Sequence, residues 1–183
     1  MKKIPTLFVR GDDFLVRPEL NNECAEWISL HALVNFTEKF DGTNARLTTT
    51  GGTIVKLEQR RRKSGEYVDI DMADREHAPL IAAARGTCVL DWPDGQHLCE
   101  AIGPKIQGNP YKLDGGKCIR FLSLPVMRAA ISFDSIRHSL TVHWWMEGVV
   151  FHDDTRTRFA KIKRRDFGLQ WPPRPSEADV FVG

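Results

Sequence analysis

The sequence predicts an α+β fold in which antiparallel strands dominate. The chain has 183 residues, of which 42% are hydrophobic and 27% charged, as is ordinary for a globular protein. This length favours one domain, residues 1–183, with its own core. From residue 32 onward, short β-prone segments alternate with glycine, proline and aspartate turns. Only two longer segments have the 3.6-residue periodicity of a helix.

The spacing of the apolar residues and the positions of turn residues predict the elements in order. We expect a short element at 24–30, strands at 32–40, 45–49, 53–61, 87–90, 97–102, 118–124, 148–151 and 158–163, and helices at 72–85 and 133–140. The rest of the first thirty residues is expected to be irregular. Because the strands follow one another through short turns, most neighbours should pair as hairpins.

Turn residues mark the hairpins. Gly51-Gly52 joins the second and third predicted strands, Pro93-Asp94-Gly95 joins 87–90 to 97–102, and Asp153-Asp154 turns a closing hairpin. Along 53–61 the side chains should alternate, which places Leu57 on one face of the strand and Glu58 on the other.

The helix at 72–85 is bounded by recognisable residues. Asp71 is a candidate N-cap and Gly86 a candidate stop. Leu80, Ile81 and Ala84 would form its core face. Beyond the last strand, the proline-rich segment 171–175 ends the fold and is expected to wrap its surface.

Charge and cysteine usage narrow the class of protein. The net charge is only +2, but residues 60–63 and 161–165 are dense basic clusters, which are either solvated faces or phosphate contacts. The four cysteines lack zinc-ligand spacing and are expected to be free thiols in a reducing cytoplasm. Neither a signal peptide nor a membrane span is apparent in the sequence.

The most informative segment is Lys39-Phe40-Asp41-Gly42, at the end of a predicted strand. A lysine followed by one spacer and Asp-Gly is the nucleophile motif of enzymes that form a covalent lysine–nucleotide intermediate. The alternative is a surface turn, because Asp-Gly is a common turn dipeptide. The downstream residues decide between the two.

Four later segments contain side chains suited to nucleotide chemistry. Arg60 and Arg61 end a strand and can bind ribose or phosphate. A carboxylate at Glu100 can accept two hydrogen bonds from a ribose. Glu147 precedes a buried strand and can hold a divalent metal. Alternation places Lys161 and Lys163 on one strand face, where both can hold a phosphate.

Together these segments resemble motifs I, III, IV and V of the covalent nucleotidyltransferases, the superfamily of ATP-dependent DNA and RNA ligases and mRNA capping enzymes. Three longer segments narrow the resemblance to small ATP-dependent RNA ligases of bacteria and phages, a group that includes the human 5′-to-3′ RNA ligase. They are residues 3–8, residues 102–110 and residues 160–169 with Trp171-Pro172. The likeness covers nearly the whole chain.

The resemblance implies a fold and a role for each residue. The fold is a single adenylyltransferase domain, ATP-grasp-like, with antiparallel sheets around an ATP cleft. Lys39 takes the AMP, Asp41 orients the lysine region, Gly42 permits a close turn, Glu100 holds the ribose, Phe121 stacks on adenine, Glu147 binds metal, and Lys161 and Lys163 hold the α-phosphate. The motif Ia arginine is either Arg60 or Arg61.

These residues also explain how a lysine becomes a nucleophile. A free lysine, with a pKa of about 10.4, is protonated at neutral pH and cannot attack phosphorus. Lys161, Lys163 and a bound metal would favour the neutral form of Lys39 and would stabilise the transition state.

The implied function is ATP-dependent joining of 5′-phosphate and 3′-hydroxyl RNA ends through lysyl-AMP, with Mg²⁺ or Mn²⁺. The chain ends about twenty residues after Lys163, so we expect a minimal domain without a separate C-terminal domain. An RNA end-processing protein is an expected partner. A cytoplasmic protein in a bacterium or a phage-infected cell is expected. The alternatives are a DNA ligase, a capping guanylyltransferase and a non-catalytic nucleic-acid end-binding module.

Overall fold

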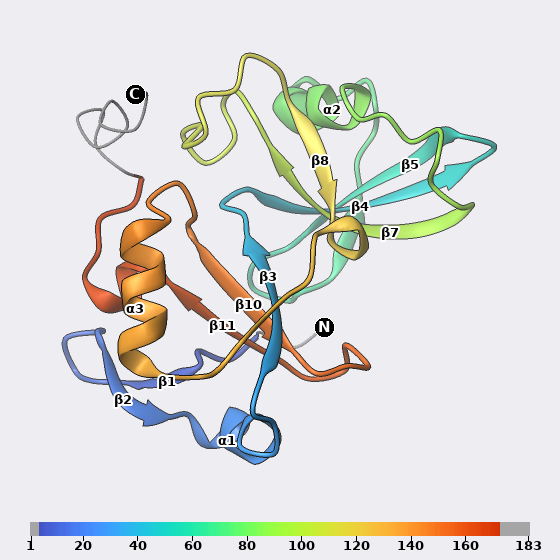
Figure 1. Ribbon diagram of the computed structural model, residues 1–183. Coiled ribbons are helices and arrows are strands. Elements are labelled where there is room, and N and C mark those ends of the chain that lie inside the picture. Colours follow the sequence, from blue (N-terminus) through green and yellow to red (C-terminus); the bar gives the residue numbers. More distant parts are fainter. Residues whose placement is uncertain (1–3, 173–183) are drawn as a thin grey trace, which may run out of the picture. The chain divides into compact units, whose positions relative to one another are not determined.

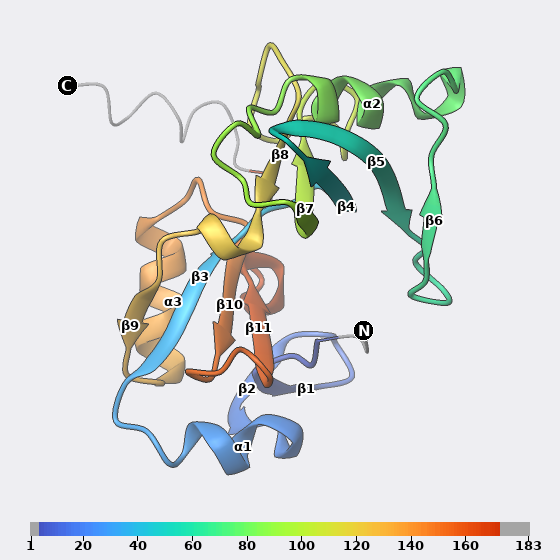
Figure 2. The same ribbon diagram turned by 90° about the vertical axis from the view of Figure 1, so that its right-hand side faces the viewer.

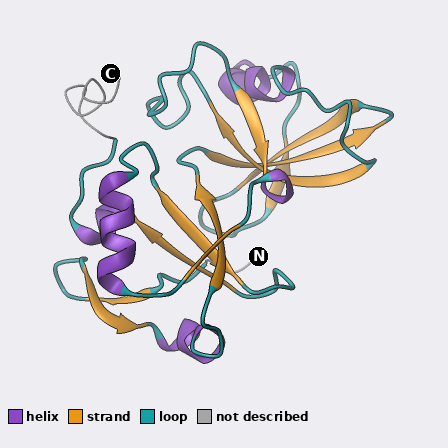
Figure 3. Ribbon diagram, viewed as in Figure 1, coloured by secondary structure: helices purple, strands orange, loops and turns teal. Residues whose placement is uncertain are grey.

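A computed structural model describes residues 4–172, in which the chain forms two compact units. One unit is Phe40–Leu124. The other combines Ile4–Lys39 with the described residues from Pro125 onward. Strands predominate in both units, accompanied by three α-helices within the described range (Figure 3). Lys39 is thus the last residue of a segment of one unit, and Phe40 begins the other unit.

The unit Phe40–Leu124 is built on a five-stranded sheet of order β6-β5-β4-β7-β8, in which all neighbours are antiparallel. Its strands are β4 (Thr43–Thr50), β5 (Thr53–Arg60), β6 (Tyr67–Asp69), β7 (Gly95–Ile102) and β8 (Lys117–Arg120). Helix α2 (Ala78–Arg85) lies over one face (Figure 2). Leu80 and Ile81 of the helix share a core with Leu47, Leu57 and Cys99 of the strands.

The second unit has a four-stranded antiparallel sheet of order β11-β10-β3-β9. Its strands are β3 (Val34–Lys39), β9 (Met127–Ala129), β10 (Gly148–His152) and β11 (Phe159–Lys163). Helix α3 (Phe133–Val142) packs beside this sheet (Figure 1), with Ile136 and Leu140 in one core with Val149 and Phe151. A two-stranded sheet of β1 (Phe8–Arg10) and β2 (Val16–Leu20) and helix α1 (Asn22–Ile28) complete the unit.

The antiparallel α+β architecture is confirmed, and so are most of the predicted elements. The strand at 32–40 is β3, the Gly51-Gly52 hairpin is β4–β5, the helix at 133–140 is α3, and the closing hairpin is β10–β11. Gly86 does end α2, and Leu80, Ile81 and Ala84 are buried as expected. All four cysteines are free, and only Cys88 is exposed.

The strand predicted at 87–90 is wrong. Thr87 instead closes α2, because its hydroxyl donates to the Ala83 carbonyl at 2.7 Å. The same hydroxyl accepts the Cys118 amide at 2.8 Å, and a turn from Val89 to Trp92 follows. Strand β7 therefore pairs with β4 and β8 rather than with an upstream neighbour.

Three other boundaries differ from the prediction. The helix expected from residue 72 begins only at Ala78, because Asp71 and Asp74 make local turns and Pro79 fits only a first helical turn. The strand 118–124 stops at Arg120, where a 3₁₀ turn, η2 (Phe121–Ser123), begins. The first thirty residues contain β1, β2 and α1 rather than mostly irregular chain.

None of the helices within residues 4–172 has the length and apolar character needed to cross a bilayer. The predicted surface-wrapping tail lies mainly at 173–175, outside the described residues.

Candidate functional site

Lys39 and Lys163 bind the two oxygens of one carboxylate. The Nζ atom of Lys39 is 2.5 Å from Oε2 of Glu147, and the Nζ atom of Lys163 is 2.6 Å from Oε1. Arg165 adds a longer contact of 3.7 Å to Oε1. Glu147 is completely buried, whereas the two lysine side chains are about a fifth exposed. A buried carboxylate requires such partners, because its isolated charge would be strongly disfavoured.

Strand register explains why these two lysines contact the same carboxylate. Gly148 of β10 pairs with Lys39 of β3 on one side and with Lys163 of β11 on the other. Residues opposite one another in a ladder project to the same face of the sheet. Glu147 immediately precedes β10, and its backbone carbonyl accepts the Arg164 amide at 2.9 Å. The predicted strand-end carboxylate is therefore fixed between two strand-end lysines.

Gly148 is a glycine because the strands approach too closely for a side chain. A Cβ atom there would lie 2.2 Å from the Ile162 carbonyl oxygen and 2.8 Å from Cα of Lys163. Both are backbone atoms, which cannot move without shifting β11. The Glu147-Gly148 pair thus combines the site carboxylate with the close packing that brings Lys163 to it.

Lys161 lies on the same strand face as Lys163, as alternation predicts. Ala160, which precedes Lys161, and Ile162, which lies between the two lysines, are fully buried in the core. The backbone of Lys161 is held by the N-terminal segment, since its amide donates to the Pro5 carbonyl and its carbonyl accepts from Leu7. This contact gives the segment near residue 5 a structural role: it covers the edge of β11.

The basic run after Lys163 is a short turn rather than a free charged tail. In η3 (Arg164–Phe167), Asp166 accepts the Lys163 amide at 2.9 Å and pairs with Arg10. Arg164 is buried and donates to the carbonyls of Leu140 and Gln170. Arg165 is the exposed member, with its side chain 58% accessible.

In the unit Phe40–Leu124, Glu100 binds Gly42 and Asn44, which come shortly after Lys39 in the chain. One oxygen of Glu100 accepts the Gly42 amide at 3.2 Å, and the other is 3.5 Å from Nδ2 of Asn44. A Cβ atom on Gly42 would lie 2.2 Å from the Ala101 carbonyl oxygen. Gly42 is thus required for close packing against β7, and its φ is not positive as a left-handed turn would need.

Glu100 belongs to a polar row on the face of the five-stranded sheet opposite the core that packs against α2. Asn44 pairs with Glu100, and its side chain accepts the Tyr67 hydroxyl at 2.6 Å. Tyr67 in turn pairs with Arg60. Desolvation raises the pKa of Tyr67, against the opposing charge of Arg60. Arg60 therefore shares the face of Glu100, whereas Arg61 lies beyond the end of β5 and is exposed.

The ion pair of Arg46 with Glu58 packs against the ring of Tyr67. Arg46 binds both oxygens of buried Glu58, at 2.5 and 2.6 Å, and its guanidinium lies 4.5 Å from the centre of the Tyr67 ring. Hydrogen bonding from Arg46 lowers the pKa of Glu58. Glu58 and Leu57 lie on different faces of β5, as the predicted alternation requires. Alternation alone does not predict that Glu58 is buried; the ion pair with Arg46 compensates its charge there.

Tyr111 fixes the backbone next to Lys39. Its hydroxyl accepts the Asp41 amide at 2.6 Å, and its ring centre lies 5.7 Å from that of Phe40. The surrounding loop has positive φ angles at Lys105 and Asn109, and Asn109 stabilises it through two bonds to Leu113. The contact of Asp41 thus involves its backbone.

The structure groups the predicted residues by unit. Lys39, Glu147 and Lys163 are in direct contact, with Lys161 on the same strand, and Gly42 contacts Glu100 on the polar row that includes Arg60. Phe121 begins η2 and is half-buried beside β7, so it is not part of a strand. Asn44, Tyr67, Tyr111 and Arg46 were not assigned a role from sequence; only the place of Asn44, just after Gly42, could have suggested one.

The donor set fits a weakly held divalent cation. Glu147 is a carboxylate facing several cations, and residues 4–172 contain no cluster of three His, Cys, Asp or Glu side chains suited to a metal. One carboxylate is enough for Mg²⁺ or Mn²⁺ when phosphate oxygens and water complete the shell.

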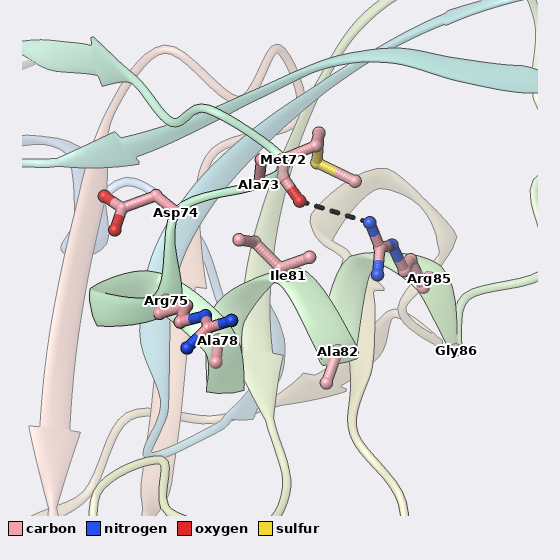
Figure 4. A pocket seen from close by; sticks show the side chains of 9 residues that line it. All are labelled: Met72, Ala73, Asp74, Arg75, Ala78, Ile81, Ala82, Arg85 and Gly86. Carbon is pink, nitrogen blue, oxygen red and sulfur yellow. Dashed lines mark hydrogen bonds between the residues drawn. The ribbon is translucent and has the colours of Figure 1, made fainter.

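A surface pocket elsewhere is unrelated to these residues. It has a volume of about 550 Å³ and lies against α2, where Arg85 donates to the Met72 carbonyl at 3.1 Å (Figure 4). Its lining residues, all between Met72 and Gly86, include none of the predicted site residues.

Comparison with known proteins identifies the fold. No family model and no curated protein matches the chain. Solved structures of a Naegleria gruberi RNA ligase do match: a lysine-to-alanine mutant with ATP and manganese aligns at a TM-score of 0.55 and 16% identity, over 92% of this chain and 62% of that one. A lysine-to-methionine mutant with AMP and manganese aligns at 0.53 and 16%, over 87% and 59%. This chain therefore has the fold of those RNA ligases and spans about three-fifths of their length.

Proposed function

We propose that this chain is an ATP-dependent RNA ligase that works through a lysyl-AMP intermediate on Lys39. The observation that carries the proposal is the contact of Lys39 and Lys163 with the same buried carboxylate, Glu147. A shared fold with RNA ligases solved with ATP, AMP and manganese supports it. Within that fold we propose the ATP-grasp-like adenylyltransferase arrangement that the sequence motifs imply.

In the first step, Nζ of Lys39 attacks the α-phosphorus of ATP. The bond from that phosphorus to the bridging oxygen of the β-phosphate breaks and pyrophosphate leaves. The Lys39 ammonium gives one proton to solvent to become an amine before the attack, and a second as its phosphoramidate forms. An ammonium group has no lone pair for this attack. The ion pair with Glu147 is thus a resting arrangement, which Lys39 leaves when it reacts. Lys161 and Lys163 remain on the same strand face to bind the α-phosphate.

Glu147 would hold Mg²⁺ or Mn²⁺. When bound there, the cation would neutralise phosphate charge. It would also compete with Lys39 for the carboxylate of Glu147 and so weaken their ion pair.

The polar row around Glu100 would receive the nucleoside. Glu100 accepts hydrogen bonds readily and would bind ribose hydroxyls. Of the two candidate arginines we propose Arg60, because it projects to the face of Glu100. Phe121 stays a candidate for stacking on adenine.

Two further steps would complete ligation. AMP would pass from Lys39 to the 5′-phosphate of one RNA end, forming a pyrophosphate link. The 3′-hydroxyl of the other end would then attack that phosphorus and release AMP. Residues 1–183 would act as the minimal ligase domain, in the cytoplasm, with an RNA end-processing protein as a partner.

Labelling with α-³²P-ATP and Mg²⁺ or Mn²⁺ tests the proposal. Wild-type protein should retain an acid-labile label, and Lys39→Ala should retain none. Lys117→Ala, which removes an exposed strand lysine, is the matched control and should label like the wild type. An unlabelled wild type, or equal labelling of Lys39→Ala, would overturn the proposal.

Ligation assays separate the remaining alternatives. A DNA ligase would seal nicked DNA in preference to 5′-phosphorylated RNA, and a capping guanylyltransferase would take label from GTP rather than ATP. A non-catalytic end-binding module would bind RNA without becoming labelled.

A further inference from the structure

Three ring side chains stand together just before Glu147. The ring of Trp145 lies 5.1 Å from that of His143 and 5.9 Å from that of Trp144, nearly perpendicular to both. Trp145 is 48% exposed, and the preceding Val142 is 49% exposed. We refer to His143, Trp144 and Trp145 as the ring cluster. A large aromatic side chain left half in water, beside other exposed apolar groups, indicates a contact surface.

The ring cluster is held on an ordered turn between α3 and β10. The His143 amide donates to the Ser139 carbonyl at 2.8 Å, and the Met146 amide donates to the His143 carbonyl at 3.1 Å. Met146 itself is buried. The backbone that carries the rings is therefore already ordered, which lowers the conformational entropy lost when a partner binds.

The turn also lies beside an exposed arginine. Arg164 bonds to both of its flanks, through the Leu140 carbonyl on α3 and the Glu147 carbonyl before β10. Arg165 follows directly, is exposed, and reaches within 3.7 Å of Glu147. Only Met146 separates Trp145 from Glu147 in the chain, so their Cα atoms are at most about 7 Å apart.

The charge of this region selects the kind of partner. Lys163 and Arg165 contact the same oxygen of Glu147, at 2.6 and 3.7 Å, so two cations share one carboxylate oxygen, and Arg165 is exposed. Exposed aromatic rings beside a cationic surplus are the combination with which proteins bind single-stranded nucleic acid, through base stacking and phosphate contacts. An apolar protein segment would gain nothing from the cationic surplus.

We propose that the ring cluster stacks on a base of a single-stranded RNA end, with Arg165 binding the adjoining phosphate. This inference rests on the proposed function for the identity of the strand, and it assigns that strand a surface next to Glu147. Trp145 is the principal stacking residue because it is the more exposed of the two tryptophans and contacts both other rings.

Fluorescence anisotropy with a 5′-phosphorylated, labelled RNA of about 12 nucleotides, in EDTA without ATP, measures this binding without catalysis. Trp145→Leu should raise the dissociation constant by about 5- to 100-fold, as loss of one stacked base implies. Trp145→Phe should recover most of the affinity. Leu30→Ala, which truncates an exposed apolar residue of the same unit, should bind like the wild type.

The phosphate contact has its own signature. Arg165→Gln should reduce the slope of log affinity against log salt by about one, and Trp145→Leu should leave that slope unchanged. RNA should also quench tryptophan fluorescence in the wild type and less so in Trp145→Phe. These two readouts remain informative if Trp145→Leu folds poorly.

Equal affinities of wild type and Trp145→Leu, or no quenching, would overturn the inference and would leave a protein partner as the occupant of the surface. The ATP-labelling assay separates this failure from that of the proposed function. If the wild type is labelled but RNA binding does not depend on Trp145, only the ring-cluster inference fails. Unlabelled wild type with RNA binding that depends on Trp145 removes only the ligase proposal.

Discussion

Lys39 and Lys163 lie on either side of Gly148, and their ammonium groups bind opposite oxygens of Glu147. One buried carboxylate thus sets the position of two lysines that are 124 residues apart in the chain. Its loss would remove the negative charge that lies between the two ammonium groups.

Glu147→Gln should therefore abolish most nucleotide transfer. The amide keeps the shape of the side chain but removes the charge that holds both lysines and would hold a metal. We expect the initial rate of Lys39 labelling to fall at least about 100-fold, as with loss of other electrostatic groups in active sites. Glu19→Gln, an exposed carboxylate of the same unit, is the control. A Glu147→Gln variant within tenfold of the wild type would contradict the assignment.

Gly148→Ala tests the close approach of β10 and β11. Its new methyl would lie 2.2 Å from the Ile162 carbonyl oxygen, so the strands must separate. Overpacking of this kind typically costs about 1–3 kcal/mol in the free energy of unfolding. Urea unfolding measures that cost, and labelling of the folded fraction measures the displacement of Lys163. Gly115→Ala, which has open space for a methyl, should change neither.

Tyr67→Phe tests the polar row that orients Glu100. The variant removes the hydroxyl that donates to Asn44 at 2.6 Å and leaves the ring over which Arg46 lies. Looser placement of Asn44 and Glu100 should weaken ribose binding, so the KM for ATP should rise about three- to tenfold, corresponding to about 1 kcal/mol. The maximal labelling rate should change less than twofold. A fall in rate at constant KM would show that Tyr67 acts elsewhere.

Local patterns were sufficient to predict the half of the site that depends on strand alternation. Lys161 and Lys163 share a face because the strand repeats every two residues, and Glu147 precedes a buried strand that its apolar residues mark. The contacts of Lys39 with Glu147 depend on the pairing of β3 with β10, which are over 100 residues apart in sequence. Local propensity contains no information on such pairing.

The polar row was not predictable for a related reason. Tyr67 and Tyr111 reach Asn44 and Asp41 from other strands and loops, and neither belongs to a motif whose spacing indicates a contact. The wrong strand at 87–90 has the same origin: its β-branched and apolar residues favour extended chain, but Thr87 is used by α2 and by the Cys118 amide. Tertiary hydrogen bonds overrode propensity there.

Asp153 should make the stability of the β10–β11 hairpin depend on pH. It lies at the predicted turn and accepts hydrogen bonds from the Thr157 amide at 2.8 Å, the Thr157 hydroxyl at 2.9 Å and Nε of Arg158 at 3.1 Å. Burial acts to raise the pKa of Asp153, but these bonds outweigh it and hold the pKa well below its usual range.

A folded-state pKa below the unfolded value of about 3.9 contributes stability above pH 4, and this contribution is lost as the pH falls towards the folded pKa. Asp153→Asn should lower the free energy of unfolding by about 2 kcal/mol at pH 7, because bonds to a charged acceptor are replaced by bonds to a neutral one. The difference from wild type should shrink below pH 4. Urea unfolding at pH 7, 5 and 3.5 measures it, with Asp12→Asn, an exposed carboxylate of the same unit, as the control. A difference that is constant over this range would mean that Asp153 stabilises the turn by shape rather than by charge.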